Sequence, residues 1–399
     1  MDFSTLTPAP APRAVPGTAV VVGENLPADA DAMYDAFTRA FAADTLDEPA
    51  LVVTTSGSTG KPKQTVLTAG ALQASAQATA DATNSHGAQW MLALPLHYVA
   101  GAQVVARSAF AGVRPVITRS ITRHTPFTPE DFLATAQRMH PGARMLSLVP
   151  AQLHTLLDSH NEQVLSELQS FTAILLGGAP ASSRLLTQCQ DLSINVVTTY
   201  GSAETAGGCV YNSRPLSGVR IQIQDPDEHG VGRVWLGGDT LASGYLNDAE
   251  KTATSFFNDA HGNRWYRTDD RGSLTNGVLT IEGRADDVLI TGGIKVSARK
   301  ITERLEEHPA IREAIVAGVP HPKWGQMVTA MVTQVPGESA PQSQELTDFV
   351  ASTLGKPAAP KVIEVCERFP AASTGKPDRR AIHRMLAQAA AAKIQSEKH

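Results

Sequence analysis

Short apolar runs alternate with segments of helical periodicity over the first 200 residues. The runs predict buried strands at 51–53, 91–94, 113–117, 145–149, 173–176 and 194–198. Apolar residues that recur every three to four positions predict helices over 28–43, 72–83, 132–139, 151–157 and 182–189. Thr68 is expected to cap the second of these helices. Strands that alternate with helices indicate an α/β fold with mostly parallel, covered sheets. Ligands of such sheets bind beyond the carboxyl ends of the strands.

The pattern changes after Val219. Short strands at 220–224, 232–236 and 278–281 indicate a small β-rich subdomain. Two helices (301–307 and 345–354), three strands (314–319, 327–335 and 362–365) and an Ala-rich helix from 380 follow. They indicate an α+β domain of a usual size. We therefore expect a large N-terminal domain over 1–284 and a small C-terminal domain over 285–399.

Composition narrows the classes of partner. The chain of 399 residues has a net charge of -5, which gives no electrostatic case for binding nucleic acid or an anionic membrane. No apolar run approaches the roughly 20 residues that span a bilayer, and no basic segment precedes an apolar core at the N-terminus. We expect a cytoplasmic protein with small-molecule partners, and the sequence leaves homo-oligomerisation open. The widely spaced Cys189, Cys209 and Cys366 are expected to be reduced, buried thiols.

Residues 54–64, Thr-Thr-Ser-Gly-Ser-Thr-Gly-Lys-Pro-Lys-Gln, follow the first strand and have the chemistry of a polyphosphate site. Glycines let the backbone present N–H groups to an anion, and hydroxyl and lysine side chains add donors and charge. A Walker A loop is excluded, because Thr55 replaces its first glycine and Pro62 its Ser or Thr. The plainer alternative is a flexible surface loop.

The string resembles the phosphate loop of the adenylate-forming superfamily, which contains acyl- and aryl-CoA synthetases, adenylation domains and luciferases. In that family the loop holds the β- and γ-phosphates of ATP while a carboxylate attacks the α-phosphate. Gln64 stands where the family usually has glycine. The resemblance assigns ATP binding to Thr55, Ser56, Gly57, Ser58, Thr59, Gly60 and Lys61.

A second motif, Thr-Tyr-Gly-Ser-Ala-Glu-Thr at 199–205, places an aromatic ring and a carboxylate after a strand. A tyrosine ring can stack on a purine, and a carboxylate can hold Mg²⁺ beside phosphates. It resembles the family motif Tyr-Gly-x-Thr-Glu, with Ala203 in place of Thr. The resemblance implies that Tyr200 stacks on adenine and Glu204 binds Mg²⁺. Gly201 and Thr205, with the matching loop Gly178, Ala179 and Pro180, complete the nucleotide site; plain turns are the alternative at both places.

Two further motifs lie in the last third of the chain. In the family a single Asp binds the ribose hydroxyls, an Arg touches the ribose, and the residue two positions later is the domain hinge. The resemblance assigns these roles to Asp270, Arg284 and Asp286, with Asp269 replacing a glycine. It also implies that a loop with Gly292 and Gly293 approaches the thiol of CoA. A solvated acidic turn and an Asp-rich linker are the alternatives.

Lys376, in Ser-Thr-Gly-Lys-Pro-Asp, matches the adenylation lysine of the family, which bridges the substrate carboxylate and the α-phosphate. Together the five ordered motifs imply two half-reactions. An acid and ATP·Mg²⁺ give an acyl-adenylate and pyrophosphate, and the thiol of CoA then displaces AMP. ATP, Mg²⁺ and CoA are the implied cofactor set, and rotation of the C-terminal domain about Asp286 lets one site serve both steps.

The class of acid substrate is suggested by the sequences at 94–101, 147–153 and 207–211 and by the short region before the phosphate loop. They resemble a short branch of the family that activates an acid with two carboxylates. By that match Arg107 and Ser147 bind the carboxylate that is kept, and His97 gates the acyl site or the thiol tunnel. A surface arginine, a strand-packing serine and a core histidine are the alternatives. Other acyl-CoA synthetases, an adenylation domain that loads a carrier protein and a non-catalytic ATP-binding protein stay open as functions.

Overall fold

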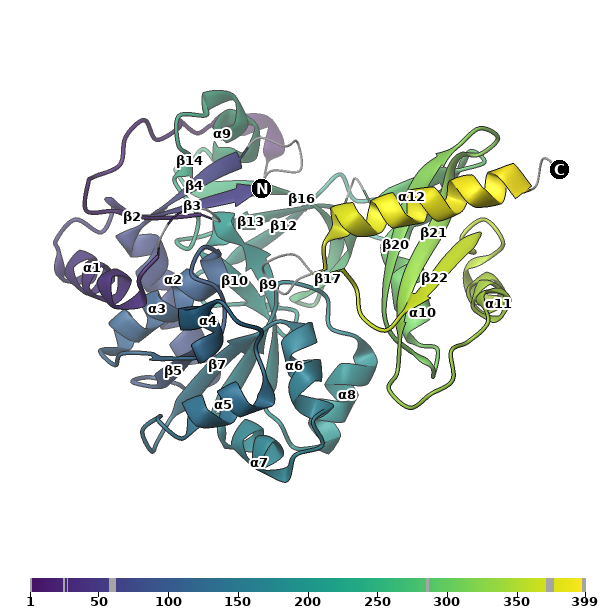
Figure 1. Ribbon diagram of the computed structural model, residues 1–399. Helices are drawn as coiled ribbons and strands as arrows, with labels where there is room; N and C mark the ends of the chain where they lie inside the picture. The colour runs from purple at the N-terminus through teal and green to yellow at the C-terminus, as the bar shows by residue number, and fades with distance from the viewer. Residues whose placement is uncertain are drawn as a thin grey trace. The chain divides into compact units, whose positions relative to one another are not determined.

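The computed structural model describes residues 2–23, 26, 28–56, 62–284, 287–370 and 377–396. The chain divides into two compact units, shown with their elements in Figure 1. The first comprises Met1–Ala181, Gln188–Thr268 and Ser273–Thr280, and the second Ser182–Thr187, Asp269–Gly272 and Ile281–His399. No helix in the described part of the chain is long and apolar enough to cross a membrane.

A seven-stranded sheet in the order β11-β10-β9-β8-β7-β5-β6 forms the centre of the first unit. Its strands are β5 (Gln89–Leu92), β6 (Val116–Ile117), β7 (Arg144–Leu148), β8 (Ala173–Leu176), β9 (Val196–Ser202), β10 (Gly207–Tyr211) and β11 (Arg214–Pro215). The pairs from β6 through β9 are parallel, and β10 and β11 are antiparallel to their neighbours. The predicted parallel sheet is confirmed.

Helices cover this sheet, as the ribbon in Figure 1 shows. They are α2 (Ala69–Thr83), α3 (Val99–Ala111), α4 (Arg119–Arg123), α5 (Pro129–Ala136), α6 (Pro150–Leu157) and α7 (Glu162–Ser170). Helix α8 (Ser183–Asp191) is divided between the two units. The hydroxyl of Thr68 accepts a hydrogen bond from the N–H of Ala71 at 3.1 Å, which confirms the predicted cap of α2.

Several strand bounds differ from the prediction, and not every helix was predicted. β5 begins at Gln89, before the predicted start at Met91, because the polar Gln89 side chain is buried with both ends hydrogen-bonded, to Arg114 and His140. Helix α3 was not predicted, and its small Gly101 lies directly against the Pro95 carbonyl. The tyrosine–glycine motif lies within β9, because β9 continues to Ser202 as it pairs with β10.

The phosphate-loop motif connects two strands of a second sheet, in the order β14-β4-β3-β2. These strands are β2 (Val20–Val22), β3 (Pro49–Ser56), β4 (Pro62–Thr68) and β14 (Gly244–Tyr245), with α1 (Ala30–Ala42) between β2 and β3. A third sheet confirms the predicted β-rich subdomain. It contains β1 (Thr7–Pro8), β12 (Arg220–Gln224), β13 (Gly232–Gly237), β15 (Phe256–Asn258), β16 (Arg264–Thr275) and β17 (Val278–Arg284), and α9 (Ala249–Ser255) precedes β15. Two short 3-10 helices, η1 (Phe3–Thr5) and η2 (Ala203–Thr205), complete this part.

The second unit is built on a five-stranded sheet. Its elements are β18 (Val288–Thr291), β19 (Ile294–Ser297), α10 (Ala298–Glu306), β20 (Ile311–His321), β21 (Gly325–Gln334), α11 (Ser343–Leu354), β22 (Val362–Cys366) and α12 (Arg379–Ser396). One core cluster contains Ile301 and Leu305 of α10, and a second contains Ile382 and Leu386 of α12. The predicted α+β architecture is confirmed, and β20 and β21 are longer than predicted.

The cysteines are free thiols, and two of the three match the expectation. Burial raises the pKa of Cys189 to about 11 and that of Cys209 to about 12, so both stay protonated and unreactive at neutral pH. The prediction is wrong for Cys366, which is only half-buried at the end of the edge strand β22.

Glu306, at the end of α10, is expected to make the second unit less stable as pH rises. Burial raises the pKa of its carboxyl group from 4.5 to about 7, although the N–H of Ala314 donates to it at 3.1 Å. The nearby carboxylates of Glu313 and Glu303 add to the increase. The folded state therefore binds the proton of Glu306 more tightly than the unfolded state does. The protonated carboxyl group stabilises the folded state fully below about pH 4.5, and this stabilisation disappears as pH rises past 7.

The test compares unfolding of the wild type and Glu306→Gln in urea. Between about pH 5.5 and about pH 8, the free energy of unfolding should fall by up to about 2 kcal/mol more in the wild type than in the variant. This follows from about 1.4 kcal/mol per unit of pKa difference. Glu307→Gln, an exposed glutamate of the same helix end, should behave like the wild type. An identical pH dependence in wild type and Glu306→Gln would contradict the assignment.

Candidate active site

The carboxyl ends of the parallel strands lie level at one edge of the central sheet. Leu148 of β7 is opposite Leu176 of β8, and Leu176 is opposite Thr198 of β9. This register brings together the segments that follow, because neighbouring parallel strands end at the same edge. The predicted residues at this edge are His97 after β5, Ser147 in β7, Gly178, Ala179 and Pro180 after β8, and Tyr200, Gly201, Glu204 and Thr205 in and after β9.

Two glycines of these motifs are required by packing. A Cβ on Gly177 would collide with the Thr199 hydroxyl of the neighbouring strand, and Gly178 has a φ of +79°. A Cβ on Gly201 would collide with the carbonyl oxygen of Gly207 in β10. Gly177 therefore lets the loop after β8 approach β9, and Gly201 lets β9 approach β10, at the place where the nucleotide is expected.

Glu204 lies in η2 and is only 9% exposed. The hydroxyl of Ser202 accepts a hydrogen bond from the Glu204 N–H at 3.2 Å and so fixes the turn. The buried hydroxyl of Tyr245, from β14, donates to Oε1 of Glu204 at 2.8 Å. Burial, and next the charge of Glu204, raise the pKa of Tyr245, so its hydroxyl stays a donor at neutral pH.

The phosphate-loop residues are only partly described. Thr55 and Ser56 are the last residues of β3, and Ser56 pairs with Pro62 at the start of β4. Gly57, Ser58, Thr59, Gly60 and Lys61 lie outside the described residues, as do Asp286 and Lys376. The loop therefore begins and ends on an antiparallel strand pair next to β14.

The proposed ribose residues belong to the second unit. Asp269 and Asp270 lie in strand β16, so the alternative of an acidic turn is wrong. Nη2 of Arg284 lies 3.3 Å from Oδ2 of Asp269, so the additional aspartate pairs with the arginine of the next strand. Asp270 is half-buried beside this pair.

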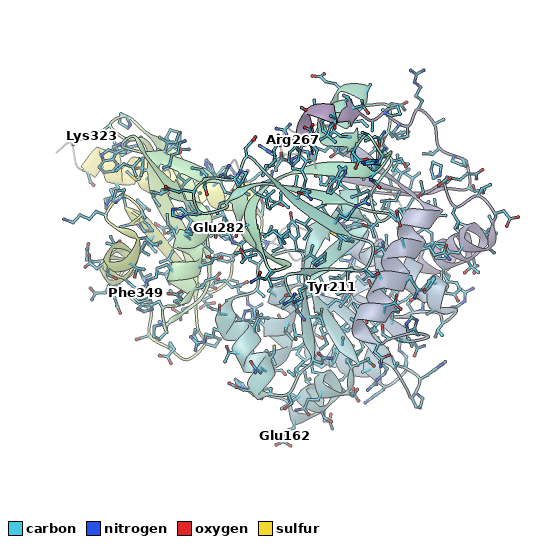
Figure 2. All side chains as sticks on the ribbon, turned by 180° about the vertical axis from the view of Figure 1, so that it is seen from behind. Glu162, Tyr211, Arg267, Glu282, Lys323 and Phe349 are labelled. Carbon is cyan, nitrogen blue, oxygen red and sulfur yellow. The ribbon has the colours of Figure 1, made fainter. Side chains whose placement is uncertain are left out.

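Gly292 and Gly293 form the turn between β18 and β19, with φ values of 57° and 80°. The turn borders an open hollow of about 760 Å³ on the second unit. Its lining residues are Val288, Ile290, Gly292, Gly293, Lys323, Trp324, Gly325 and Gln326, of which Lys323 is labelled in Figure 2. The hollow gives the glycine turn an accessible face within its own unit.

Arg107 is a buried cation on α3. It is 6% exposed, so the alternative of a surface arginine is wrong. Its Nη2 donates to the hydroxyl of Tyr211 at 3.3 Å, and its guanidinium lies 5.3 Å from the centre of the Trp90 ring. Among the described residues, Nε of Arg107 has no hydrogen-bond partner and no carboxylate lies within ion-pair distance. A small enclosed cavity adjoins both Arg107 and Trp90.

Ser147 and His97 are the two other residues that the sequence assigns to the acyl site. Ser147 is 6% exposed and lies one residue before the end of β7. His97 is half-buried, with its ring 4.3 Å from that of Tyr98, in the segment between β5 and α3. Within the described residues, no hydrogen bond joins Ser147 or His97 to Arg107.

Three residues that support the site were not predicted from the sequence. Tyr211 (labelled in Figure 2) bonds both Arg107 and, at 2.9 Å, Thr79 of α2. Trp90 lies beside the guanidinium, and Tyr245 bonds Glu204. Tyr211 stood in a string that resembled the family without a role for each residue, whereas no local pattern connects Tyr245 with a partner 41 positions away.

Two family models match the chain: AMP-binding enzyme at residues 7–246, and AMP-binding enzyme C-terminal domain at residues 300–376. The chain belongs to the AMP-binding enzyme family. This result agrees with the resemblance of its motifs to the adenylate-forming superfamily.

The relatives narrow the class further. The chain is 39% identical to the probable 2-succinylbenzoate–CoA ligase of Mycobacterium tuberculosis (strain H37Rv), over 86% of this chain and 85% of that protein. It is 30% identical to the 2-succinylbenzoate–CoA ligase of Bacillus subtilis (strain 168), over 83% of this chain and 68% of the relative. These relatives confirm the resemblance, noted in the sequence, to one branch of the family.

Solved structures agree with the fold. The o-succinylbenzoate CoA synthetase from Bacillus subtilis, in complex with its acyl-adenylate intermediate, matches with a TM-score of 0.68 and 29% identity, over 84% of this chain and 69% of that chain. ATP-bound MatB from Rhodopseudomonas palustris matches with a TM-score of 0.72 at 23% identity, over 86% of this chain and 69% of that chain. The predicted fold, with a large N-terminal and a small C-terminal domain, is confirmed.

Proposed function

We propose that this chain is an acid–CoA ligase that acts on 2-succinylbenzoate in menaquinone biosynthesis. ATP activates the acid to an acyl-adenylate with release of pyrophosphate, and CoA then accepts the acyl group with release of AMP. The observation that carries the choice of acid is the buried Arg107, which has no carboxylate partner among the described residues. The relatives named for the same reaction support it.

The buried charge of Arg107 favours an acid with two carboxylates for an electrostatic reason. A buried charge without a counterion destabilises a protein by several kcal/mol. An acid with two carboxylates supplies the counterion, because one carboxylate is activated and the other stays ionised. Arg107 can bind that carboxylate through its free Nε, while Tyr211 and Trp90 hold the guanidinium in place. A monocarboxylic acid would leave this cation unpaired.

Glu204 is the residue that fits magnesium. Mg²⁺ bound with ATP usually takes one or two carboxylates, substrate phosphates and waters, and when bound it neutralises phosphate charge. The described residues contain no cluster of three or more metal-binding side chains, so a site that shares its ligands with the nucleotide fits better than a closed protein site. Glu204 can offer one oxygen, because Tyr245 holds the other.

The remaining residues orient the reactants in this proposal. Tyr200 stacks on adenine beside Gly178, Ala179 and Pro180, and Asp270 and Arg284 bind the ribose. The phosphate loop binds the β- and γ-phosphates, and the ammonium group of Lys376 stabilises charge that develops on the α-phosphate. Ser147 joins Arg107 at the kept carboxylate.

The second half-reaction uses the same acyl-adenylate. The sulfur of CoA attacks the acyl carbonyl, the bond from that carbonyl to the phosphate oxygen of AMP breaks, and the thiol proton passes to solvent. We propose that rotation about Asp286 brings the turn of Gly292 and Gly293 to the thiol, and that His97 controls its access.

The acceptor is tested by mass spectrometry of the products from 2-succinylbenzoate and ATP·Mg²⁺. We expect the thioester of free CoA and stoichiometric AMP. A phosphopantetheinyl carrier protein at the same concentration serves as the competing acceptor. Acylation of the carrier with no CoA thioester would replace this proposal by that of a carrier-loading adenylation domain, and no pyrophosphate with any acid would favour a non-catalytic ATP-binding protein.

A further inference from the structure

We propose that Tyr245 is a positioning residue for the ATP·Mg²⁺ site. It holds Glu204 in the orientation that binds the metal, and its segment links Glu204 to β4. The proposal rests on the proposed function at one point, the assignment of Glu204 as the magnesium ligand. It does not depend on which acid is activated.

The first observation is the buried hydrogen bond itself. Tyr245 is 1% exposed, and its hydroxyl donates to Oε1 of Glu204 at 2.8 Å. An ionised carboxylate only accepts hydrogen bonds, so the direction of this bond is fixed. One oxygen of Glu204 is therefore held by the protein, and the second oxygen is the one left for a ligand.

The second observation is that the segment around Tyr245 bonds to both parts of the nucleotide site. The N–H of Ala242 donates to the carbonyl of Glu204 at 2.9 Å. The N–H groups of Ser243 and Leu246 donate to the carbonyls of Val66 and Gln64, at 2.9 and 2.8 Å. Val66 and Gln64 lie in β4, the strand that follows the phosphate loop. Residues 242–246 thus join the turn of Glu204 to the exit of that loop.

Two cations strengthen this connection. Nε of Arg264 donates to the carbonyl of Ala242 at 2.9 Å, and its Nη2 bonds the carbonyl of Ser243. The ammonium group of Lys63, on β4, lies 5.8 Å from the centre of the Tyr245 ring. The ring of Tyr245 therefore lies near a cation of β4, while its hydroxyl bonds Glu204.

The physical consequence is preorganisation. Partners that orient a metal ligand typically change metal affinity by roughly 10–100-fold when they are removed. Without the hydroxyl, Glu204 would keep its place in η2 but its carboxylate could rotate, and a buried oxygen would lose its donor. The loss should appear in the binding of metal-loaded ATP and not in that of ATP alone.

The experiment measures ATP binding by calorimetry in the absence of acid, with Mg²⁺ and with EDTA. We expect Tyr245→Phe to reduce the enhancement of ATP affinity by Mg²⁺ roughly 10-fold or more, with the affinity in EDTA unchanged. Titration of the ATP complex with Mn²⁺, followed by electron paramagnetic resonance, gives the metal affinity directly and should fall in parallel. Phenylalanine keeps the edge contact with Phe256, whose ring lies 5.6 Å away, so the fold should be preserved.

Matched variants separate the possible outcomes. Tyr34→Phe, which also removes the hydroxyl of a buried tyrosine but lies on α1, should keep the full enhancement, and 3-fluorotyrosine at position 245 should restore it. Glu204→Gln should abolish the enhancement by Mg²⁺, and the addition of Tyr245→Phe to that variant should cause no further loss. An enhancement retained in Tyr245→Phe but lost in Glu204→Gln overturns the role of Tyr245. If Glu204→Gln itself retains the enhancement, the magnesium assignment in the proposed function is wrong, and the role of Tyr245 fails with it.

Discussion

Replacement of Arg107 by methionine is expected to lower kcat/KM for 2-succinylbenzoate roughly 10²–10³-fold, because a buried charge pair that loses one partner typically costs 2–5 kcal/mol. Methionine keeps much of the volume and the apolar stem but cannot bind a carboxylate. The same variant should be as stable as the wild type or more stable in the absence of substrate. The cation it removes is buried, and no carboxylate among the described residues pairs with it.

The measurement is pyrophosphate release with 2-succinylbenzoate and with two analogues, each of which lacks one carboxylate. Arg107→Met should lose its preference for the diacid and leave the rate with the adenylatable mono-acid nearly unchanged. Arg114→Met is the matched control, since Arg114 is half exposed and pairs with Asp31 and Asp35 on α1. Equal losses for the diacid and the mono-acid would show that Arg107 does not bind the kept carboxylate.

Replacement of Lys376 by alanine is expected to slow adenylation roughly 10²–10³-fold, the usual effect of removing one group that stabilises charge in a transition state. The second half-reaction does not need this ammonium group in the proposed mechanism. Thioester formation from chemically prepared acyl-adenylate and CoA should therefore continue near the wild-type rate.

The two half-reactions are followed separately, by pyrophosphate release and by thioester formation. Lys393→Ala is the matched control, because Lys393 lies on α12 and, among the described residues, its Nζ donates only to the carbonyl of Lys361. Adenylation at the wild-type rate in Lys376→Ala, together with loss of thioester formation, would assign Lys376 to the other step.

The sequence predicted the fold where a local pattern is repeated. Apolar runs such as 173–176 became β8 with the same bounds, because a strand buried on both faces has few polar positions. Helix α3 was not predicted, since its alanines, valines and glycine do not form one apolar face. Its small residues instead allow close packing, as at Gly101 against Pro95.

The same distinction applies to the site. The glycine-, hydroxyl- and carboxylate-containing motifs are contiguous, so they could be found without knowledge of the fold. The supports of the site are not contiguous: Arg107 meets Tyr211 across 104 positions, and Tyr245 meets Glu204 across 41. These groups meet in the folded chain, where Tyr245 lies on β14 beside β4 and Tyr211 lies on β10 beside β9.

Pyrophosphate release by the wild type with a panel of acids tests the proposed function most directly. The panel contains 2-succinylbenzoate, benzoate, salicylate, a medium-chain fatty acid and several amino acids, each with ATP·Mg²⁺ and with or without CoA. We predict a large preference for 2-succinylbenzoate and formation of its CoA thioester. A preference for a monocarboxylic acid would contradict the proposed substrate and the role of Arg107, and would leave only the family and its two-step mechanism.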